Sequence, residues 1–231
     1  MFKQIVTVIL FILAGAFGGI LVQRFAPNLY VQPNTAPSYV IRENNIYIQE
    51  NDALKDSVQK TKSFVLGVRS VVSDKKILSG SGLVLTSDGM AVTLAELVPS
   101  GSKTIVFYVD GQPVQAQVIK RDLKENLALV KIEKSGLSVG GFFIFDQLAL
   151  GERVFLVSQT FDPQTSAPGF LTNEGVVKTF TADTIETNIQ ESKALGAPVF
   201  DIKGYVMGIT SSSSGSVTVI PITKIRDFSK L

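Results

Sequence analysis

The sequence contains no cysteine, no histidine and no tryptophan among its 231 residues. Without cysteine there are no disulfides, thiolate metal sites, iron–sulfur clusters or cysteine nucleophiles. Without histidine the chain lacks the side chain that most often performs acid–base chemistry near neutral pH, and also the commonest metal ligand. Asp and Glu residues do not cluster at ligand spacing either, so we expect no metal and no cofactor.

Charge is also scarce. Charged residues make up 18% of the chain, below the share of about 25% in typical soluble domains. The net charge of +2 is too small to indicate a nucleic-acid partner. Hydrophobic residues reach 45%, which is enough for a sizeable core and excludes wholesale disorder.

The longest apolar run covers residues 5–22, where no residue is charged and only Thr7 is polar. As a helix this run would be about 27 Å long, close to the hydrocarbon thickness of about 30 Å. We therefore expect residues 1–24 to form a membrane anchor. Lys3 lies on the N-terminal side, so the positive-inside rule favours a single-pass protein of the cytoplasmic membrane with its C-terminal domain extracytoplasmic.

A cleaved signal peptide is the alternative for this run. Small residues at 14–16 could form a cleavage site, and cleavage near Ala16 would give a secreted protein. The apolar run continues beyond Ala16 to Val22, however, and a mature N-terminus has no reason to retain it. The anchor is the favoured interpretation.

Residues 25–62 are expected to form a linker that ends in a short helix. Pro27, Pro33 and Pro37 interrupt a stretch without sustained periodicity, which is typical of an extended spacer. Asn51 or the next residue could cap a helix that continues to about Lys62.

From residue 63 the pattern changes to short runs rich in β-branched and aromatic residues, separated by turn residues. Expected strands lie near 64–72, 80–86, 90–94, 104–109, 113–120, 127–133, 153–158, 171–180, 184–188, 197–200, 206–211 and 217–221, followed by a short helix over 222–228. No helical pattern separates the strands, which argues against βαβ winding. Two sets of six strands predict an all-β domain over 63–231, with one barrel at about 63–135 and another at about 142–221.

Four segments in order resemble trypsin-like serine proteases of the HtrA/Deg type. They are SGSGLVLTSDGMAVT at 79–93, RD at 121–122 with NLALVKI at 126–132, GAPVF at 196–200 with GYVMGI at 204–209, and IPI at 220–222. The resemblance covers about residues 64–227. It implies a trypsin-like double six-stranded β-barrel from a bacterium, and the peptide-binding PDZ domain of many family members is not expected.

The same resemblance places Glu96, Asn126 and Leu195 where the family has its catalytic His, Asp and Ser. A triad needs a nucleophilic oxygen, an imidazole that moves its proton and a carboxylate that orients the imidazole. Leu195 has no nucleophilic atom, and a glutamate, whose unperturbed pKa is about 4.3, is a weak base at neutral pH. The replaced triad implies a pseudoprotease rather than an enzyme.

An atypical serine endopeptidase remains the alternative, with Ser192 as a non-standard nucleophile. Lys193 is adjacent to Ser192, but neighbouring residues of an extended segment point to opposite sides, so the ammonium would not face the hydroxyl.

The expected function is therefore non-catalytic binding or scaffolding on the extracytoplasmic side. The partner would be a protein or an extended peptide, held as an added strand along the former cleft, and Glu96 could bind a basic group of that partner. A homo-oligomer is a third, structural alternative. Candidate peptide-binding residues are Lys193, Ala194, Gly196, Thr210, Ser211 and Ser212.

Overall fold

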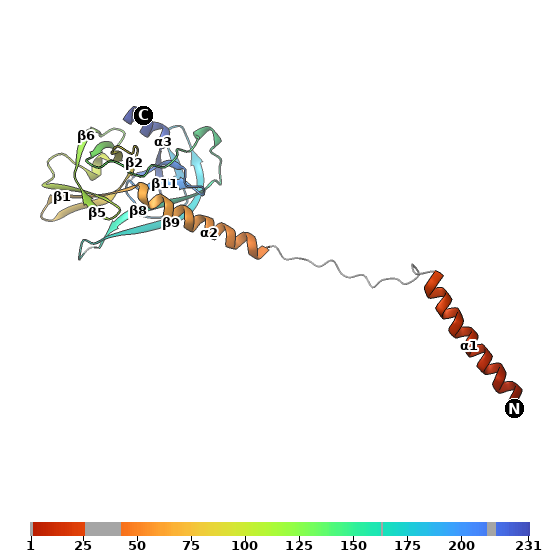
Figure 1. Cartoon of the computed structure of the whole chain (residues 1–231). Helices are drawn as coiled ribbons and strands as arrows, with labels where there is room; N and C mark the ends of the chain where they lie inside the picture. The colour runs from red at the N-terminus through yellow and green to blue at the C-terminus, as the bar shows by residue number, and fades with distance from the viewer. Residues whose placement is uncertain (1, 26–42, 163, 212–215) are drawn as a thin grey trace. The chain divides into compact units, whose positions relative to one another are not determined.

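A computed structural model describes residues 2–25, 43–162, 164–211 and 216–231 (Figure 1). The chain divides into two compact units, residues 1–44 and 45–231. The expected spacer falls mainly at residues 26–42, outside the described residues, as does Ser212.

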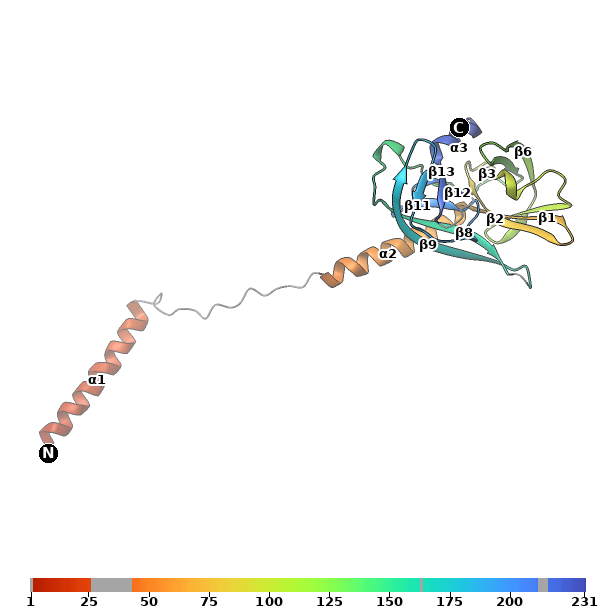
Figure 2. The same ribbon diagram turned by 180° about the vertical axis from the view of Figure 1, so that it is seen from behind.

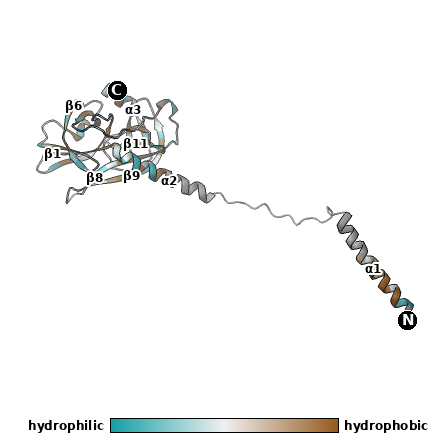
Figure 3. Ribbon diagram, viewed as in Figure 1, coloured by the Kyte–Doolittle hydropathy of each residue, from teal (hydrophilic) through white to brown (hydrophobic). Residues whose placement is uncertain are grey.

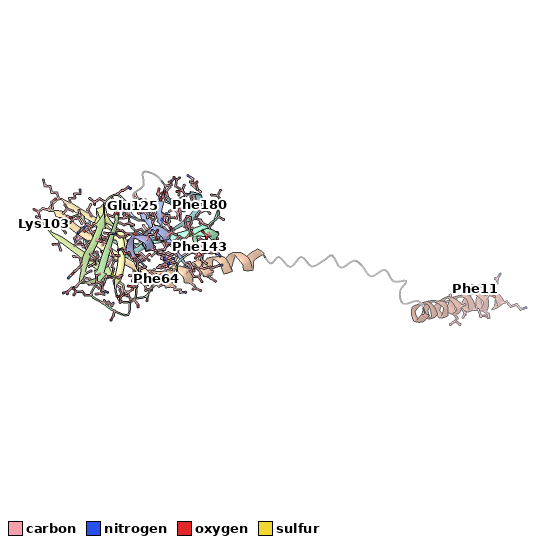
Figure 4. The ribbon with its side chains drawn as sticks, turned by 90° about the horizontal axis from the view of Figure 1, so that it is seen from above. Phe11, Phe64, Lys103, Glu125, Phe143 and Phe180 are labelled. Carbon is pink, nitrogen blue, oxygen red and sulfur yellow. The ribbon has the colours of Figure 1, made fainter. Side chains whose placement is uncertain are left out.

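The first unit contains helix α1, Phe2–Phe25. Hydrophobic residues colour the described part of α1 brown in Figure 3, and Phe11, labelled in Figure 4, is 73% exposed. Among the described residues, no helix combines the length and the apolar character that a membrane crossing requires. The membrane span expected over residues 5–22 is therefore not confirmed.

Helix α2 extends over Glu43–Thr61, so it begins earlier than the expected start at Asn51. The physical reason is that no proline or glycine lies between Pro37 and Gly67, and a residue that favours a cap does not prevent a helix from starting before it. Leu54 and Val58 pack against the core of the second unit.

The first barrel is a seven-stranded antiparallel sheet in the order β5-β4-β1-β2-β3-β7-β6. Its strands are β1 (Val65–Ser73), β2 (Lys76–Val84), β3 (Met90–Leu94), β4 (Thr104–Val109), β5 (Gln112–Val114), β6 (Ala116–Asp122) and β7 (Leu127–Ile132). Only Gln115 separates β5 from β6, and its carbonyl accepts the N–H of Glu133. The two edge strands of the sheet, β5 and β6, are therefore consecutive in the chain. Their short connection brings the two edges together, so the sheet curves into a barrel.

The second barrel is closed, in the order β10-β13-β12-β11-β8-β9. Its strands are β8 (Arg153–Phe161), β9 (Pro168–Phe180), β10 (Ile185–Thr187), β11 (Pro198–Asp201), β12 (Val206–Ser211) and β13 (Thr218–Pro221). The predicted all-β fold is confirmed, but the first sheet has seven strands instead of the expected six, because the strand expected at 113–120 is interrupted at Gln115 and forms β5 and β6. Figure 2 shows from behind that the tip of the β8–β9 hairpin projects from the fold.

Buried side chains join the two barrels. Phe155 and Phe200 of the second barrel belong to the same apolar cluster as Phe64 before β1, and the rings of Phe155 and Phe200 stack with centroids 5.3 Å apart. A separate cluster fills the second barrel alone.

The C-terminal helix α3, Ile222–Ser229, matches the helix expected over 222–228. From this helix Lys224 reaches Glu125 at 2.8 Å and Asp183 at 2.9 Å. Glu125 precedes β7 in the first barrel and Asp183 precedes β10 in the second, so one ammonium group ties both barrels to the helix. Glu125 is labelled near α3 in Figure 4.

Candidate functional site

Glu96 is presented on a single turn of 3-10 helix, Ala95–Leu97, that follows β3. Ala95 and Leu97 are buried and Glu96 is exposed. Because the apolar neighbours on both sides fix the turn to the core, the carboxylate is held at the surface in a defined place.

Asn126 lies directly against Glu96. Its Nδ2 donates to Oε1 of Glu96 at 2.8 Å, and its Oδ1 accepts the main-chain N–H of Glu96 at 3.0 Å. The carbonyl of Asn126 also accepts the N–H of Ala95 at 3.1 Å. Asn126 has φ of 53°, a left-handed conformation that asparagine tolerates better than most residues. The structure thus brings together the two positions that the resemblance assigns to His and Asp.

Leu195 lies in the loop between β10 and β11, and its side chain is half-buried against the first core. Its carbonyl accepts the N–H of Ser81 at 2.8 Å. The next residue, Gly196, has φ of 69°, and a Cβ at Gly196 would collide with the carbonyl of Ser81 and approach a methyl group of Leu97. The loop of Leu195 therefore packs on β2 beside the turn that carries Glu96.

Thr210 of β12 is hydrogen-bonded to the loop that carries Leu195 and holds it in place. Its hydroxyl donates to the carbonyl of Ala194 and accepts the N–H of Ala197, the latter at 2.9 Å. The main chain of Thr210 accepts the N–H of Gly196 at 3.0 Å. Thr210, Ala194 and Gly196 are all buried, so these three candidates shape the loop from inside.

The other candidates for peptide binding differ in exposure. Lys193 is exposed, whereas Ser211 is half-buried and its hydroxyl donates to the carbonyl of Thr218 at 3.3 Å. Ser212 lies outside the described residues. Of the candidate residues that the structure describes, Lys193 is the most open to a ligand.

Glu191 is a residue of this site that sequence analysis missed. In a triad protease, the N–H groups of the nucleophile and of the residue two positions before it stabilise the oxyanion. At that earlier position the N–H of Lys193 donates to Oε1 of Glu191 at 3.1 Å. The N–H at one of the two positions that form the oxyanion hole in a triad protease thus already donates to a carboxylate in this chain. In the sequence, the glutamate two residues before Lys193 was the signal that could have indicated this contact.

A groove of about 900 Å³ borders Leu195. It is lined by Ser79, residues 159–162, residues 167–172, Ser192, Lys193 and Leu195. Asp162 stands at the tip of the β8–β9 hairpin, where the main-chain N–H and the hydroxyl of Thr165, and then the N–H of Gln164, hold the pKa of its carboxyl below the usual range. No group of residues suited to a metal ion occurs in the described part of the chain.

The family model for the trypsin-like peptidase domain matches residues 80–209, more than half of the chain. Similar proteins are described as "probable periplasmic serine endoprotease DegP-like". One from Pseudomonas putida (strain GB-1) is 30% identical over 57% of this chain and 28% of its own length. Another, from Chlamydia pneumoniae, is 32% identical over 64% of this chain and 32% of its own length. The chain thus spans about a third of these relatives, and the resemblance to the HtrA/Deg type is confirmed.

Proposed function

Because this chain belongs to the trypsin-like peptidase domain family, we propose that it is a pseudoprotease that binds extended polypeptide without cleaving it. One observation carries this proposal: an alkyl side chain, Leu195, borders the groove at the position that the family gives to its nucleophile. An alkyl group cannot attack a carbonyl in any environment.

Two further contacts support the loss of catalysis. Glu96 and Asn126 satisfy each other in a reciprocal pair, and Glu191 already occupies the N–H of Lys193. The groove itself does not depend on any catalytic group, so binding remains possible where cleavage is not.

The test uses the full-length chain, immobilised and incubated with reduced, carboxymethylated lactalbumin as an unfolded protein. We expect saturable retention of intact lactalbumin and no new fragments by mass spectrometry. Time-dependent fragments would contradict the loss of catalysis. Absence of both retention and fragments would contradict the binding function and favour a purely structural scaffold, including a homo-oligomer.

The second candidate function is hydrolysis through Ser192, which is exposed and lines the groove. If fragments form in the test above, the Ser192→Ala variant decides their origin. Fragments that disappear in this variant would assign the reaction to Ser192. Fragments that persist would exclude Ser192 as the nucleophile.

The proposal includes attachment to the extracytoplasmic side of a membrane through residues 5–22. The described side chains of α1 from Ile5 to Leu13 are apolar apart from Thr7, and the large ones are exposed. The relatives are described as periplasmic. In bacterial membranes we expect the chain to resist carbonate extraction, and Ile9→Lys with Ile12→Lys to release it. Extraction of the unaltered chain by carbonate would contradict attachment.

A further inference from the structure

The hydrogen-bond pattern of the β8–β9 hairpin shows which main-chain groups face outward. In an antiparallel pair, opposite residues alternate between those that exchange hydrogen bonds and those whose N–H and C=O point away. At the hairpin end, Asp162 donates its N–H to the carbonyl of Ala167 at 2.9 Å. Two residues further along each strand, Thr160 and Gly169 are therefore also a pair that exchanges hydrogen bonds. The main-chain N–H and C=O groups of Phe170 and Thr172 in β9 consequently point away from β8.

Two independent contacts agree with this assignment. Gln159 is opposite Phe170, yet its N–H donates to the hydroxyl of Ser81 at 2.8 Å rather than across the hairpin. At the far end, Val176 exchanges hydrogen bonds with Asn188 on the outer side of β9, through its N–H at 2.8 Å and its carbonyl at 3.1 Å. Gln159 and Val176 thus both occupy positions at which the main-chain N–H and C=O groups are expected to point away from the other strand of the hairpin.

The outer edge of β9 is covered in one part and open in another. Asn188 lies along it at Val176, and Nδ2 of Asn173 donates to the carbonyl of Gln190 at 3.4 Å. Further along the hairpin, residues 168–172 of β9 line the 900 Å³ groove together with Ser192, Lys193 and Leu195. Among the described residues, the outward N–H and C=O groups of Phe170 and Thr172 have no hydrogen-bond partner.

We propose that the ligand binds in this groove as an extra strand paired with β9 over residues 168–172, continuing the line of the chain at 188–190. This inference rests on the proposed function and specifies how the peptide is held. An open strand edge with unpaired main-chain groups is a template for such an addition. Pro168 contributes only a carbonyl, so Phe170 and Thr172 supply the main-chain donors.

The side chains around the edge define the chemistry of the occupant. Phe170 is 39% exposed, and Leu171 and Leu195 add apolar surface to the same groove. Lys193 has no carboxylate partner in the described residues, and Lys62, whose ammonium stands 5.6 Å from the ring centroid of Phe170, has none either. The occupant is an extended peptide with alternating apolar side chains and a carboxylate that pairs with Lys193.

A single strand suits this groove better than a second copy of the chain. A copy would bring its own β9 together with β8, which is two strands about 4.8 Å apart. Ser192, Lys193 and Leu195 line the same groove as β9, so the second strand of such a ribbon would have to fit beside them.

The experiment uses the full-length chain and a fluorescent peptide of alternating valine and threonine that begins with aspartate. Two derivatives carry N-methyl groups, one on every valine nitrogen and the other on every threonine nitrogen. In strand addition only one set of N–H groups faces β9. Anisotropy should therefore show binding weakened about tenfold or more for one derivative and nearly unchanged for the other.

A matched pair of variants tests the same edge from the protein side. Thr172→Pro removes an outward N–H that the hairpin does not use, a position where a strand tolerates proline. Thr172→Val keeps that N–H. We expect Thr172→Pro to weaken binding and Thr172→Val to preserve it, with equal melting temperatures confirming that both fold.

Charge reversal tests the role of Lys193. Lys193→Glu should weaken binding of the peptide that begins with aspartate and strengthen binding of a peptide that begins with lysine. Lys203→Glu is the matched control, since Lys203 is exposed in the turn between β11 and β12, outside this groove.

The outcomes separate the two proposals. Equal binding of both methylated peptides would overturn the β9 edge while leaving peptide binding intact. No saturable binding of the parent peptide would overturn both. A dimer in sedimentation that Thr172→Pro abolishes would make a second copy the occupant and overturn the peptide.

Discussion

Asn126 and Glu96, thirty residues apart, form a reciprocal pair in which each donates one hydrogen bond to the other, at 2.8 and 3.0 Å. The amide donates to the carboxylate, and the main chain of Glu96 donates back to the amide oxygen. The turn that carries Glu96 is thus fixed to the chain entering β7, and these positions have a structural function that does not require catalysis.

Asn126→Asp should weaken this pair in a pH-dependent way. The variant loses the amide donor and places a second carboxylate against Glu96, and the repulsion raises the pKa values of both groups in the folded state. Since the folded state then retains protons longer than the unfolded one, stability falls as the pH rises from about 4 to 7. The expected loss at pH 7 is about 1 kcal/mol by urea unfolding.

The control for this variant reverses the polarity of the pair. Glu96→Gln combined with Asn126→Asp restores an amide opposite a carboxylate, and the new carboxylate still accepts the main-chain N–H. Most of the lost stability should return and the pH dependence should disappear. A double variant no more stable than Asn126→Asp would show that the pair does not act through these hydrogen bonds.

Leu195→Ser alone should not produce proteolysis. A serine needs a base to accept its proton, and neither Glu96 nor Asn126 supplies the imidazole that does this in a triad. Adding Glu96→His and Asn126→Asp should give slow casein cleavage. Adding Glu191→Ala as well frees the N–H of Lys193 and should raise the rate by about 10²-fold. Cleavage by Leu195→Ser as fast as by the triple variant would refute this reading of Glu96.

Gly196→Ala should lower stability by more than about 2 kcal/mol. The left-handed backbone alone costs an alanine about 1–2 kcal/mol, and the added Cβ also collides with the carbonyl of Ser81. Gly136→Ala is the control, since Gly136 has φ of 74° with no atom within 4 Å of an added Cβ. Urea midpoints compare the two variants, and equal losses would mean that contact with Ser81 is unimportant.

Lys224→Met should lower stability by about 1 kcal/mol or less, since its two ion pairs are partly exposed. Glu125 first, and then Asp183, raise the pKa of Lys224. A raised lysine pKa stabilises the fold fully below the pKa of the unfolded chain, and this stability is lost as the pH rises through the folded pKa. The difference in the free energy of unfolding between Lys224→Met and the unaltered chain should therefore become smaller in strongly alkaline solution.

Lys103→Met is the matched control for Lys224. Its ammonium pairs with Asp74 at 2.6 Å, but both side chains are more than half exposed, and solvent screens such a pair. An effect of Lys103→Met as large as that of Lys224→Met would contradict a special role for the contact between the barrels.

Local pattern predicted most of the fold. Strand positions followed from runs of β-branched residues between turns, because a turn such as Asp110-Gly111 has positive φ at both residues and only a few residue types accept it. The start of α2 at Glu43 rather than Asn51 is not predicted by the capping preference, since such a residue marks a possible start and does not prevent a helix from beginning before it.

The sequence also predicted one part of the candidate site, whereas another part depends on the tertiary structure. Motifs in the sequence assigned Glu96, Asn126 and Leu195 to the three triad positions, and the absence of a nucleophilic atom in leucine is a property of the residue type alone. That Thr210 is buried under the loop while Lys193 is exposed depends on which strands lie beneath it. No local pattern carries that information.

The sequence by itself thus determined the class of fold and the side-chain types at the three triad positions, because periodicity and side-chain type are local properties. The tertiary structure alone decided that Glu96 and Asn126 are paired, that Glu191 occupies the N–H of Lys193, and that β9 leaves residues 168–172 unpaired at its outer edge. The pairing of Glu96 with Asn126 and the open edge of β9 depend on segments far apart in the chain, whereas the contact of Glu191 with Lys193 spans two residues and depends on how the folded loop is shaped.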